Sequence, residues 1–344
     1  MGAFLANPCN PLVLVTEKRM KAVEFAQYGD PRAVAKVVEV DQPVPGPQEV
    51  LIAVEASPFR FADIYMMRGD RGFRSPLPAI PGGTGIGRVA ARGADVMTLD
   101  VGDRVYLPRT GTWREYMTAP ADILFKGPKS GDAVDLAQVN SNGITAHSLL
   151  RHGGNLNPGD WVIQSAANSN CGRYVIQLAR RWGFRTVNIV RNLGHAAELK
   201  SLGADVVVRD GADFSAKVKS ATNNAEISVG FDMVGGETTG RMAQCLANRG
   251  TIAQYGQVSR APAQVPINLM LFKHLTLYGF LAESALRDSG ATRDGFAAVY
   301  DELAGLVTQG ELKSHIGAVY SLDDVGAAID AVTLGAAGKV VITP

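Results

Sequence analysis

The chain has 344 residues, more than one hydrophobic core usually holds, so two domains are expected. A net charge of +1 excludes the basic excess of a nucleic-acid-binding protein, and 46% hydrophobic residues are typical of a globular chain. No apolar run reaches the length of a membrane span, so no membrane partner is expected.

The N-terminal stretch and the cysteines indicate a compartment. The first twenty residues lack a basic region, and their apolar run covers only Leu12 to Val15, so we expect neither a signal nor a transit peptide. The three cysteines, Cys9, Cys171 and Cys245, lack CxxC spacing and suggest no disulfide framework or structural zinc site. These features favour a reducing cytoplasm.

The first third of the chain is rich in short strand-like runs separated by Gly and Pro. The runs are KAVEF (21–25), AKVVEV (35–40), EVLIAVEA (49–56), GIGRVAA (85–91), DRVYL (103–107) and REYMTA (114–119). With turn signals such as PGP at 45–47 between them, these runs predict a compact antiparallel barrel.

From about residue 140 the pattern changes, and apolar strand-like runs alternate with helical ones. Six candidate strands are WVIQS (161–165), TVNIV (186–190), ADVVV (204–208), EISVGFDMV (226–234), GTIAQYG (250–256) and LTLYGF (275–280). This alternation predicts a doubly wound parallel sheet. Two helical stretches and a final strand, KVVITP (339–344), follow.

The turn after WVIQS is the first candidate binding site. It reads Asn168, Ser169, Asn170, Cys171, Gly172 and leads into a helix whose N-terminus suits a pyrophosphate. The literal GxGxxG is absent, so we expect Asn170 to take a left-handed backbone conformation in its place.

The end of the second strand of the parallel sheet indicates which nucleotide binds. An acid there favours NAD, and an arginine suits the 2′-phosphate of NADP. Here the strand ends in Arg191 and Asn192, and the next acid is Glu198. The guanidinium group therefore favours NADPH.

Several segments in order, IQSAANSNCG, RTVNIVRN, FDMVGG, IAQYG, LTLYGF and GKVVITP, resemble the medium-chain dehydrogenase/reductase superfamily. The resemblance is to its trans-2-enoyl thioester reductase branch, with quinone oxidoreductases as relatives, and it runs from about Met20 to the C-terminus. It implies an α/β fold in which a GroES-like β-barrel catalytic domain, residues 1–139 and 287–344, surrounds a Rossmann NADPH-binding domain, residues 140–286.

Matching positions to the family implies a set of cofactor-binding residues. These are Asn142, Asn168, Ser169, Asn170, Cys171, Arg191, Tyr255, Gly256, Gln257, Val258, Phe280, Leu281, Ala282 and Lys339. A second basic residue often follows the arginine by two places in the family, but this chain has Leu193 there.

The same comparison bears on zinc. Zinc-dependent members carry a cysteine near position 60 and Gly-His-Glu at the segment that here reads Gly82, Gly83, Thr84. Because Arg60, Gly83 and Thr84 offer no suitable ligand set, we expect no catalytic zinc.

The resemblance implies an NADPH-dependent enzyme that reduces the C=C bond of an α,β-unsaturated carbonyl compound, such as an enoyl thioester. The candidate catalytic residues are Arg60, Tyr65 and Arg71; Arg71 stands where the enoyl thioester branch carries a tyrosine. An arginine holds an oxyanion or carboxylate well and donates a proton poorly, so an anionic substrate fits Arg60 and Arg71, whereas Arg68 and Arg74 are read as solvated.

Two other functions stay open. Quinone reduction needs no positioned proton donor and so tolerates the absent tyrosine. A protein that binds NADPH without catalysis would also explain the changed segment from Arg60 to Arg71. The LTLYGF strand resembles a family edge that pairs across a dimer, so a homodimer is expected.

Overall fold

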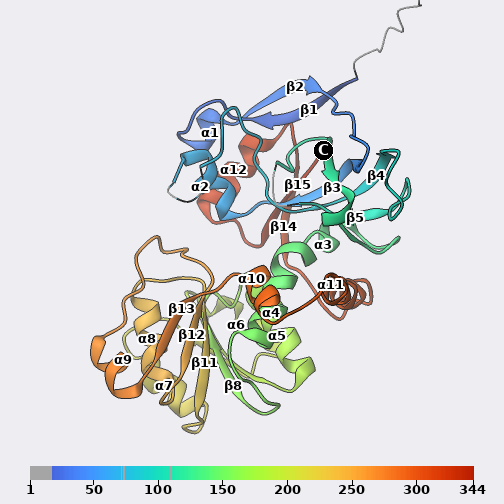
Figure 1. Ribbon diagram of the computed structural model, residues 1–344. Coiled ribbons are helices and arrows are strands. Elements are labelled where there is room, and N and C mark those ends of the chain that lie inside the picture. The colour runs from blue at the N-terminus through green and yellow to red at the C-terminus, as the bar shows by residue number, and fades with distance from the viewer. Residues whose placement is uncertain (1–17, 71, 73, 109–110) are drawn as a thin grey trace, which may run out of the picture.

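The computed structural model describes residues 18–70, 72, 74–108 and 111–344. Two lobes are visible in Figure 1, and the described residues form three sheets. We call the part that carries β1 to β7, β14 and β15 the barrel lobe, and the part that carries β8 to β13 the Rossmann lobe. The N-terminal and C-terminal parts of the described chain thus share one lobe, and its middle part forms the other.

The barrel lobe is organised around β3. This strand pairs antiparallel with β4, β6 and β15, and its alternate residues Val50, Ile52 and Val54 are buried in one apolar cluster. The strands are β1 (Arg19–Glu24), β2 (Lys36–Asp41), β3 (Glu49–Pro58), β4 (Ile86–Arg92), β5 (Arg104–Tyr106), β6 (Tyr116–Pro120), β7 (Phe125–Lys126), β14 (Ile316–Ser321) and β15 (Lys339–Thr343). The predicted barrel strands and the final strand are confirmed.

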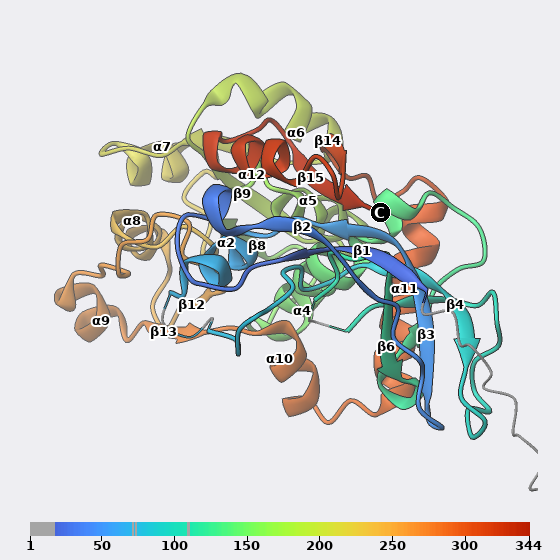
Figure 2. The same cartoon turned by 90° about the horizontal axis from the view of Figure 1, so that it is seen from above.

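Short helices complete this lobe. They are α1 (Pro31–Val34), α2 (Phe61–Arg68), η1 (Ala121–Ile123), α3 (Ala133–Leu136) and α12 (Val325–Leu334). Figure 2 shows the β1–β2 ribbon lying across the lobe and α12 beside β14 and β15. Helix α2 packs its Ile64 and Met67 into a cluster with Phe25 and Trp113, which fixes the helix that carries Tyr65.

The Rossmann lobe is a six-stranded parallel sheet of order β10-β9-β8-β11-β12-β13. Its strands are β8 (Trp161–Gln164), β9 (Arg185–Val190), β10 (Val206–Arg209), β11 (Ile227–Asp232), β12 (Thr251–Gln254) and β13 (Thr276–Gly279). All six predicted strands are present in the order of a doubly wound fold. The domain boundaries expected at 139/140 and 286/287 stay a prediction.

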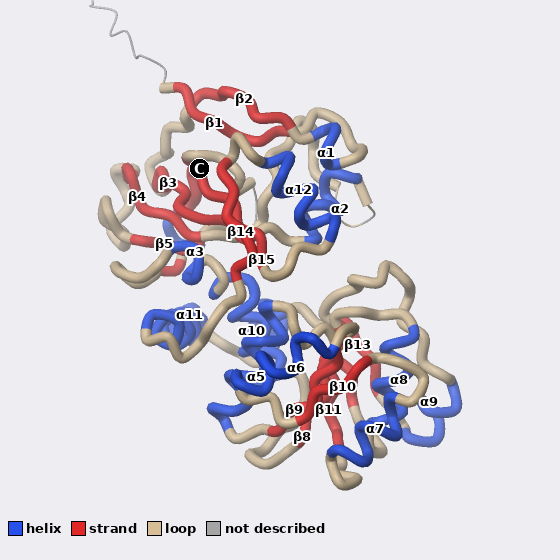
Figure 3. The backbone as a smooth tube through the Cα atoms, turned by 180° about the vertical axis from the view of Figure 1, so that it is seen from behind, coloured by secondary structure: helices blue, strands red, loops and turns tan. Residues whose placement is uncertain are grey.

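Helices cover both faces of this sheet, as Figure 3 shows, with α5 and α6 on one side and α7 and α8 on the other. The remaining elements are η2 (Val139–Gly143), α4 (Ile144–His152), α5 (Asn170–Trp182), η3 (Leu193–His195), α6 (Ala196–Leu202), α7 (Phe214–Ala221), α8 (Glu237–Cys245), α9 (Ile267–Lys273), α10 (Ala282–Asp288) and α11 (Arg293–Thr308). Among the described residues, no helix combines the length and apolar character needed to cross a bilayer.

The turn into α5 differs from the prediction in one detail. Ser169 is the N-cap, its hydroxyl accepting from the Gly172 amide at 3.1 Å, and Asn170 is the first helical residue. The left-handed residue is Ala166, with φ 50°, so the prediction for Asn170 was wrong. Gly183 ends the helix with φ 80°, as expected for a C-terminal glycine.

The two lobes share a hydrophobic core. Tyr106 and Val341 of the barrel lobe lie in one buried cluster with Tyr174 and Phe231 of the Rossmann lobe. The segment 311–315, which leads from α11 into β14, also runs along α5 and bonds to it repeatedly. These contacts fix the two lobes relative to each other.

Candidate functional site

The carboxyl ends of β8 and β11 define the site of nucleotide binding in a doubly wound sheet, because the strand order reverses between them. Ser165, just after β8, donates to the Asp232 carboxylate at 2.6 Å. Asp232 is buried at the end of β11 and also accepts from Thr239 and from the Val234 amide. This carboxylate ties the two strand ends together and shapes the loop that follows.

The turn at residues 168–172, where the chain passes from β8 into α5, fits a pyrophosphate, and we call it the pyrophosphate turn. The Nδ2 atom of Asn170 is buried without a hydrogen-bond partner among the described residues, while its Oδ1 accepts from the His315 amide at 2.9 Å. At Gly172 an added Cβ would lie 2.7 Å from the backbone of Ala167, so the close approach of α5 to the preceding turn requires glycine. An unsatisfied donor beside a capped helix N-terminus suits an anion.

An ion pair between the buried Arg173 and the partly exposed Glu198 supports this turn and was not predicted from the sequence. Both Nη atoms of Arg173 donate to the Glu198 carboxylate at 2.7 Å, and Nε of Arg173 donates to the Asn168 carbonyl at 3.1 Å. Hydrogen bonds from Arg173, opposed by burial, lower the pKa of Glu198 to about 2. The first acid after β9 is therefore neutralised by a neighbour.

Arg191 follows β9 directly and is exposed. Leu193, at the second position expected to be basic, begins η3 and is 49% exposed. The guanidinium of Arg191 therefore reaches solvent at the edge where the ribose of a bound dinucleotide would lie.

Asn142 lies on an irregular element. It is part of the π-helix η2 between α3 and α4, and its Nδ2 donates to Oε1 of Gln138 at 2.9 Å. Wide helical turns of this type are frequent at functional sites, because they turn a side chain out of the regular helix direction.

Tyr255, in the loop after β12, packs against the buried cluster that contains Cys171 of the pyrophosphate turn. Burial raises the pKa of the Cys171 thiol to about 12, with the neighbouring Tyr255 hydroxyl acting in the opposite direction. The thiol is therefore protonated at neutral pH and acts as a packing group.

The loop after β12 is fixed by backbone contacts, because the Val258 amide donates to the Met233 carbonyl at 3.0 Å and Gly256 packs on Met233. Gln257 and Val258 are exposed.

Lys339, the first residue of β15, belongs to the junction of the two lobes. Burial lowers the pKa of its ammonium group to about 8; Asp63, Arg60 and Cys171 also act on it, Asp63 and Cys171 in the opposite sense. Asp63 and Arg60 come from the barrel lobe, and Cys171 comes from the pyrophosphate turn. Lys339 thus connects the two groups of predicted site residues.

Arg60 and Asp63 form an ion pair at the start of α2. Nη2 of Arg60 lies 3.1 Å from Oδ1 of Asp63, whose side chain is fully buried, and Oδ2 accepts from the Arg60 amide at 2.7 Å. The guanidinium lies over Gly83, where an added Cβ would overlap Nη2. Neither Asp63 nor the need for glycine at position 83 was selected from sequence.

Tyr65 lies on α2, and Cζ of Arg260 lies 6.0 Å from the centre of its ring. Arg260 was not selected from sequence, although it follows the predicted loop 255–258 by two residues. Arg74 donates to the Gly69 carbonyl at 3.0 Å and lies over the Tyr28 ring, which gives it a structural contact. Arg71 lies outside the described residues.

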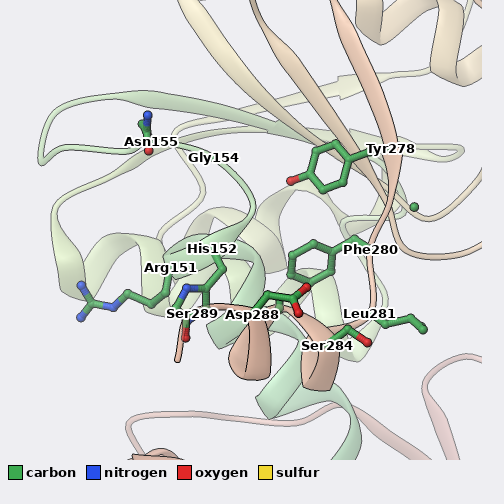
Figure 4. Close-up of a pocket in the computed structure, with 12 residues that line it drawn as sticks. Arg151, His152, Gly154, Asn155, Tyr278, Phe280, Leu281, Ser284, Asp288 and Ser289 are labelled. Atoms are coloured by element: carbon green, nitrogen blue, oxygen red, sulfur yellow. The ribbon is translucent and has the colours of Figure 1, made fainter. Parts of the chain in front are cut away.

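Phe280 and Leu281 do not lie among the residues around Lys339. Both line a pocket of about 470 Å³ between the end of α4, β13 and α10 (Figure 4). Phe280 and Ala282 are also buried in the cluster that contains Cys171, with Tyr255 packed against it. The structure therefore joins these residues through the core of the Rossmann lobe.

Metal ligands do not gather at the junction. Within the part of the chain that the structure describes, no three His, Cys, Asp or Glu side chains lie together in a way that would hold a metal ion. Arg60 and Gly83 stand at two positions where a catalytic zinc would need ligands, and a guanidinium carries no lone pair for a metal.

A Rossmann sheet joined to a barrel with a polar junction between them defines a two-lobed oxidoreductase class. The family described as alcohol dehydrogenase GroES-like domain matches residues 46–129, and the one described as zinc-binding dehydrogenase matches residues 171–301. The chain belongs to the medium-chain dehydrogenase/reductase superfamily, which confirms the predicted family and fold.

Particular relatives are enoyl reductases. The chain is 33% identical to the mitochondrial enoyl-[acyl-carrier-protein] reductase of Arabidopsis thaliana, over 85% of this chain and 80% of that protein. It is 30% identical to the enzyme of the same name from Homo sapiens, over 91% of this chain and 85% of that protein.

Solved structures are similar over nearly the whole length. A mycobacterial quinone oxidoreductase superimposes with a TM-score of 0.81 at 29% identity, covering 94% of this chain and 100% of that one. A mycobacterial structure complexed with NADPH gives a TM-score of 0.83 at 29% identity, with the same coverage of both chains.

Proposed function

We propose that this protein is an NADPH-dependent reductase of the C=C bond in an α,β-unsaturated carbonyl compound such as an enoyl thioester. The observation that carries the proposal is the junction of the two lobes, where the Phe59 amide, next to Arg60, donates to the Val340 carbonyl at 3.0 Å, and Val341 of the same strand lies in one buried cluster with Cys171 of the pyrophosphate turn. The enoyl reductases among the relatives support the same reaction.

The choice of NADPH rests on the side chains that follow the carboxyl end of β9. Arg191 is exposed there, and the first acid that follows, Glu198, is held by Arg173. A guanidinium without a competing carboxylate suits the 2′-phosphate. Bound NADPH would supply a hydride to the β-carbon of the substrate.

The chain's own residues would orient the reactants around that hydride. Asn170 and the amides at the start of α5 would hold the pyrophosphate, and Asn142 with the 255–258 loop would line the nicotinamide half. Tyr65 lies on α2, the helix whose N-cap is Arg60 and which carries Asp63, and it is our candidate for handling the proton at the α-carbon. Arg71 is proposed as a substrate contact, because it replaces the tyrosine of the enoyl thioester branch.

A second candidate is NADPH-dependent quinone reduction. The position of Tyr65 on α2 favours it, because quinone oxidoreductases also carry a tyrosine near this position, and a mycobacterial quinone oxidoreductase has the same fold. The reaction needs no proton donor placed over an α-carbon.

One assay separates these functions. NADPH oxidation is followed with crotonyl-CoA, a short enone, an unsaturated acid and a quinone as separate acceptors. Turnover of crotonyl-CoA or the enone, with appearance of the saturated product, supports the proposal. Turnover of quinone alone supports the second candidate. Tight NADPH binding without turnover of any acceptor would leave a non-catalytic NADPH-binding protein.

We also propose a homodimer that forms along β13. This strand is the edge of the parallel sheet, so its outer backbone groups are available for a strand of a second copy. The preceding helix α9 exposes Ile267 (69%), Leu271 (59%) and Phe272 (80%). An apolar helix face next to an open strand edge is best explained by a second copy of the chain.

The compartment that we propose is a reducing one such as the cytoplasm. Cys171 and Cys245, the two cysteines in the described part of the chain, are unpaired. Free thiols of this type are usual where glutathione keeps cysteines reduced.

A further inference from the structure

The guanidinium of Arg60 has more donors than partners. A guanidinium carries five N–H donors, and only Nη2 has a hydrogen-bond partner among the described residues, Oδ1 of Asp63. Nε is buried without a partner, although the side chain as a whole is 22% exposed. A buried donor without an acceptor is costly, so a group that accepts from it is expected to be part of the working site.

The position of this guanidinium is fixed by two neighbours. Asp63 accepts from both the backbone and the side chain of Arg60, which holds the charge at the start of α2. Gly83 provides the space, because any Cβ at that position would overlap Nη2. The hydroxyl of the adjoining residue, Thr84, is also buried without a partner among the described residues. One unsatisfied side chain, Arg60, therefore lies against Gly83, and a second, Thr84, follows Gly83 in the chain.

The summed charge of Arg60, Asp63 and Lys339 is positive, which favours one developing anion. Arg60 and Asp63 carry opposite charges, and Lys339 is the further cation that interacts with both. Hydride addition to the β-carbon of an unsaturated carbonyl compound moves the C=C electron pair toward the carbonyl, and the oxygen becomes an enolate oxyanion. A proton, for which Tyr65 is our candidate donor, then adds to the α-carbon and restores the C=O bond. The oxyanion exists only during the reaction, so a fixed donor placed at it lowers the barrier.

We propose that Arg60, seated over Gly83 and held by Asp63, binds the carbonyl oxygen of the substrate and stabilises the enolate oxyanion with its unpartnered N–H groups. This inference rests on the proposed C=C reduction. In it Arg60 is a catalytic residue, while Asp63 and Gly83 are positioning residues.

Chemical rescue tests the role of Arg60 with crotonyl-CoA as substrate. Arg60→Ala is expected to lower kcat by about 10²- to 10³-fold, the usual effect of removing one oxyanion donor, with much less change in KM. Added guanidinium should restore part of kcat, because Asp63 remains to hold it. Urea, which has the same shape without charge, should restore nothing.

The double variant Arg60→Ala/Asp63→Asn is the matched control for rescue. It lacks the carboxylate that would hold guanidinium, and it also avoids an unpaired buried charge, so it folds even where the single variant does not. Guanidinium should not raise its kcat. Equal rescue of both variants, or a double variant with the kcat of the unmodified protein, would overturn the proposal.

Gly83→Ala tests the position of the guanidinium. It should lower kcat while the NADPH dissociation constant stays the same, because Arg60 is displaced and the pyrophosphate turn is untouched. Gly305→Ala on α11 is the control, since its added Cβ meets no atom within 4 Å. Normal kcat in Gly83→Ala contradicts the inference.

Failure of the inference and failure of the proposed function give different results. If the unmodified protein does not reduce crotonyl-CoA or a short enone, the proposed function is wrong. If it reduces them and the Arg60 and Gly83 variants do so equally well, only the role of Arg60 is wrong.

Discussion

Arg260 of the Rossmann lobe lies 3.5 Å from Asp70 of the barrel lobe, measured from Nη2 to Oδ2. The same guanidinium faces the Tyr65 ring, so the loop after β12 touches both the end of α2 and its candidate catalytic side chain. This contact joins the loop predicted to line the nicotinamide to the helix predicted to act on the substrate.

Arg260→Ala should loosen this loop without unfolding the protein. Both side chains are substantially exposed, and an exposed ion pair contributes only about 0–1 kcal/mol, so Tm should hardly change. Hydrogen exchange at residues 257–262 should become faster. Asp70→Asn should have the same effect, and the double variant should add nothing to it. Additive effects of the two changes would show that the pair is not coupled.

Arg191→Ala should separate the two nicotinamide cofactors. A hydrogen bond to a charged group contributes about 1.5–3 kcal/mol, so the Kd for NADPH should rise by roughly tenfold to 100-fold. The Kd for NADH, which lacks the 2′-phosphate, should stay nearly constant. Fluorescence titration of both cofactors gives the comparison. Equal weakening of both would mean that Arg191 does not contact the phosphate.

Lys339 should titrate close to neutral pH. Because burial lowers its pKa to about 8, the neutral, reactive amine forms well below the pH at which a free lysine, with a pKa of about 10.4, loses its proton. Acetylation of the peptide that contains Lys339, followed by mass spectrometry across pH, should show a midpoint near 8. Bound NADPH should slow the labelling. Labelling that NADPH does not affect would place Lys339 away from the cofactor.

Glu198 should make stability depend on acid pH. Its pKa is lowered to about 2 in the folded protein from an ordinary value of 4.5. A depressed pKa contributes stability that is present above about pH 4.5 and is lost as the pH falls toward 2. The difference in urea midpoint between the unmodified protein and Glu198→Gln should therefore shrink over this range. A difference independent of pH would contradict the assignment.

The proposed dimer can be tested by a charge on α9. Phe272→Glu should convert a dimer to a monomer in analytical ultracentrifugation, because a carboxylate would be buried against the second copy. Leu334→Glu is the control, since Leu334 is 86% exposed on α12 in the other lobe. A Phe272→Glu variant that sediments as the unmodified protein does would exclude this interface.

Local patterns predicted most of the fold. Strands such as 49–56 and 186–190 were recognisable from their alternating or continuous apolar residues. The helix end was recognisable from Gly183, which takes a left-handed cap. Each of these signals lies within a few consecutive residues. The left-handed residue of the pyrophosphate turn was misplaced at Asn170. The conformation of this turn depends on how α5 packs against β8, and the sequence pattern does not contain that packing.

The candidate site also has a part that the sequence predicted and a part that only the fold shows. By itself the sequence determined the family, through an ordered set of short motifs. It also determined the six-stranded sheet, the turn at 168–172 and Arg191 at the strand end, because each of these consists of short runs of consecutive residues. Only the tertiary structure decided that Arg60 lies over Gly83, that Arg173 neutralises Glu198 and that Arg260 reaches Asp70. Those contacts join residues that are between 23 and 190 positions apart, and their formation depends on the packing of whole elements, which no local pattern encodes.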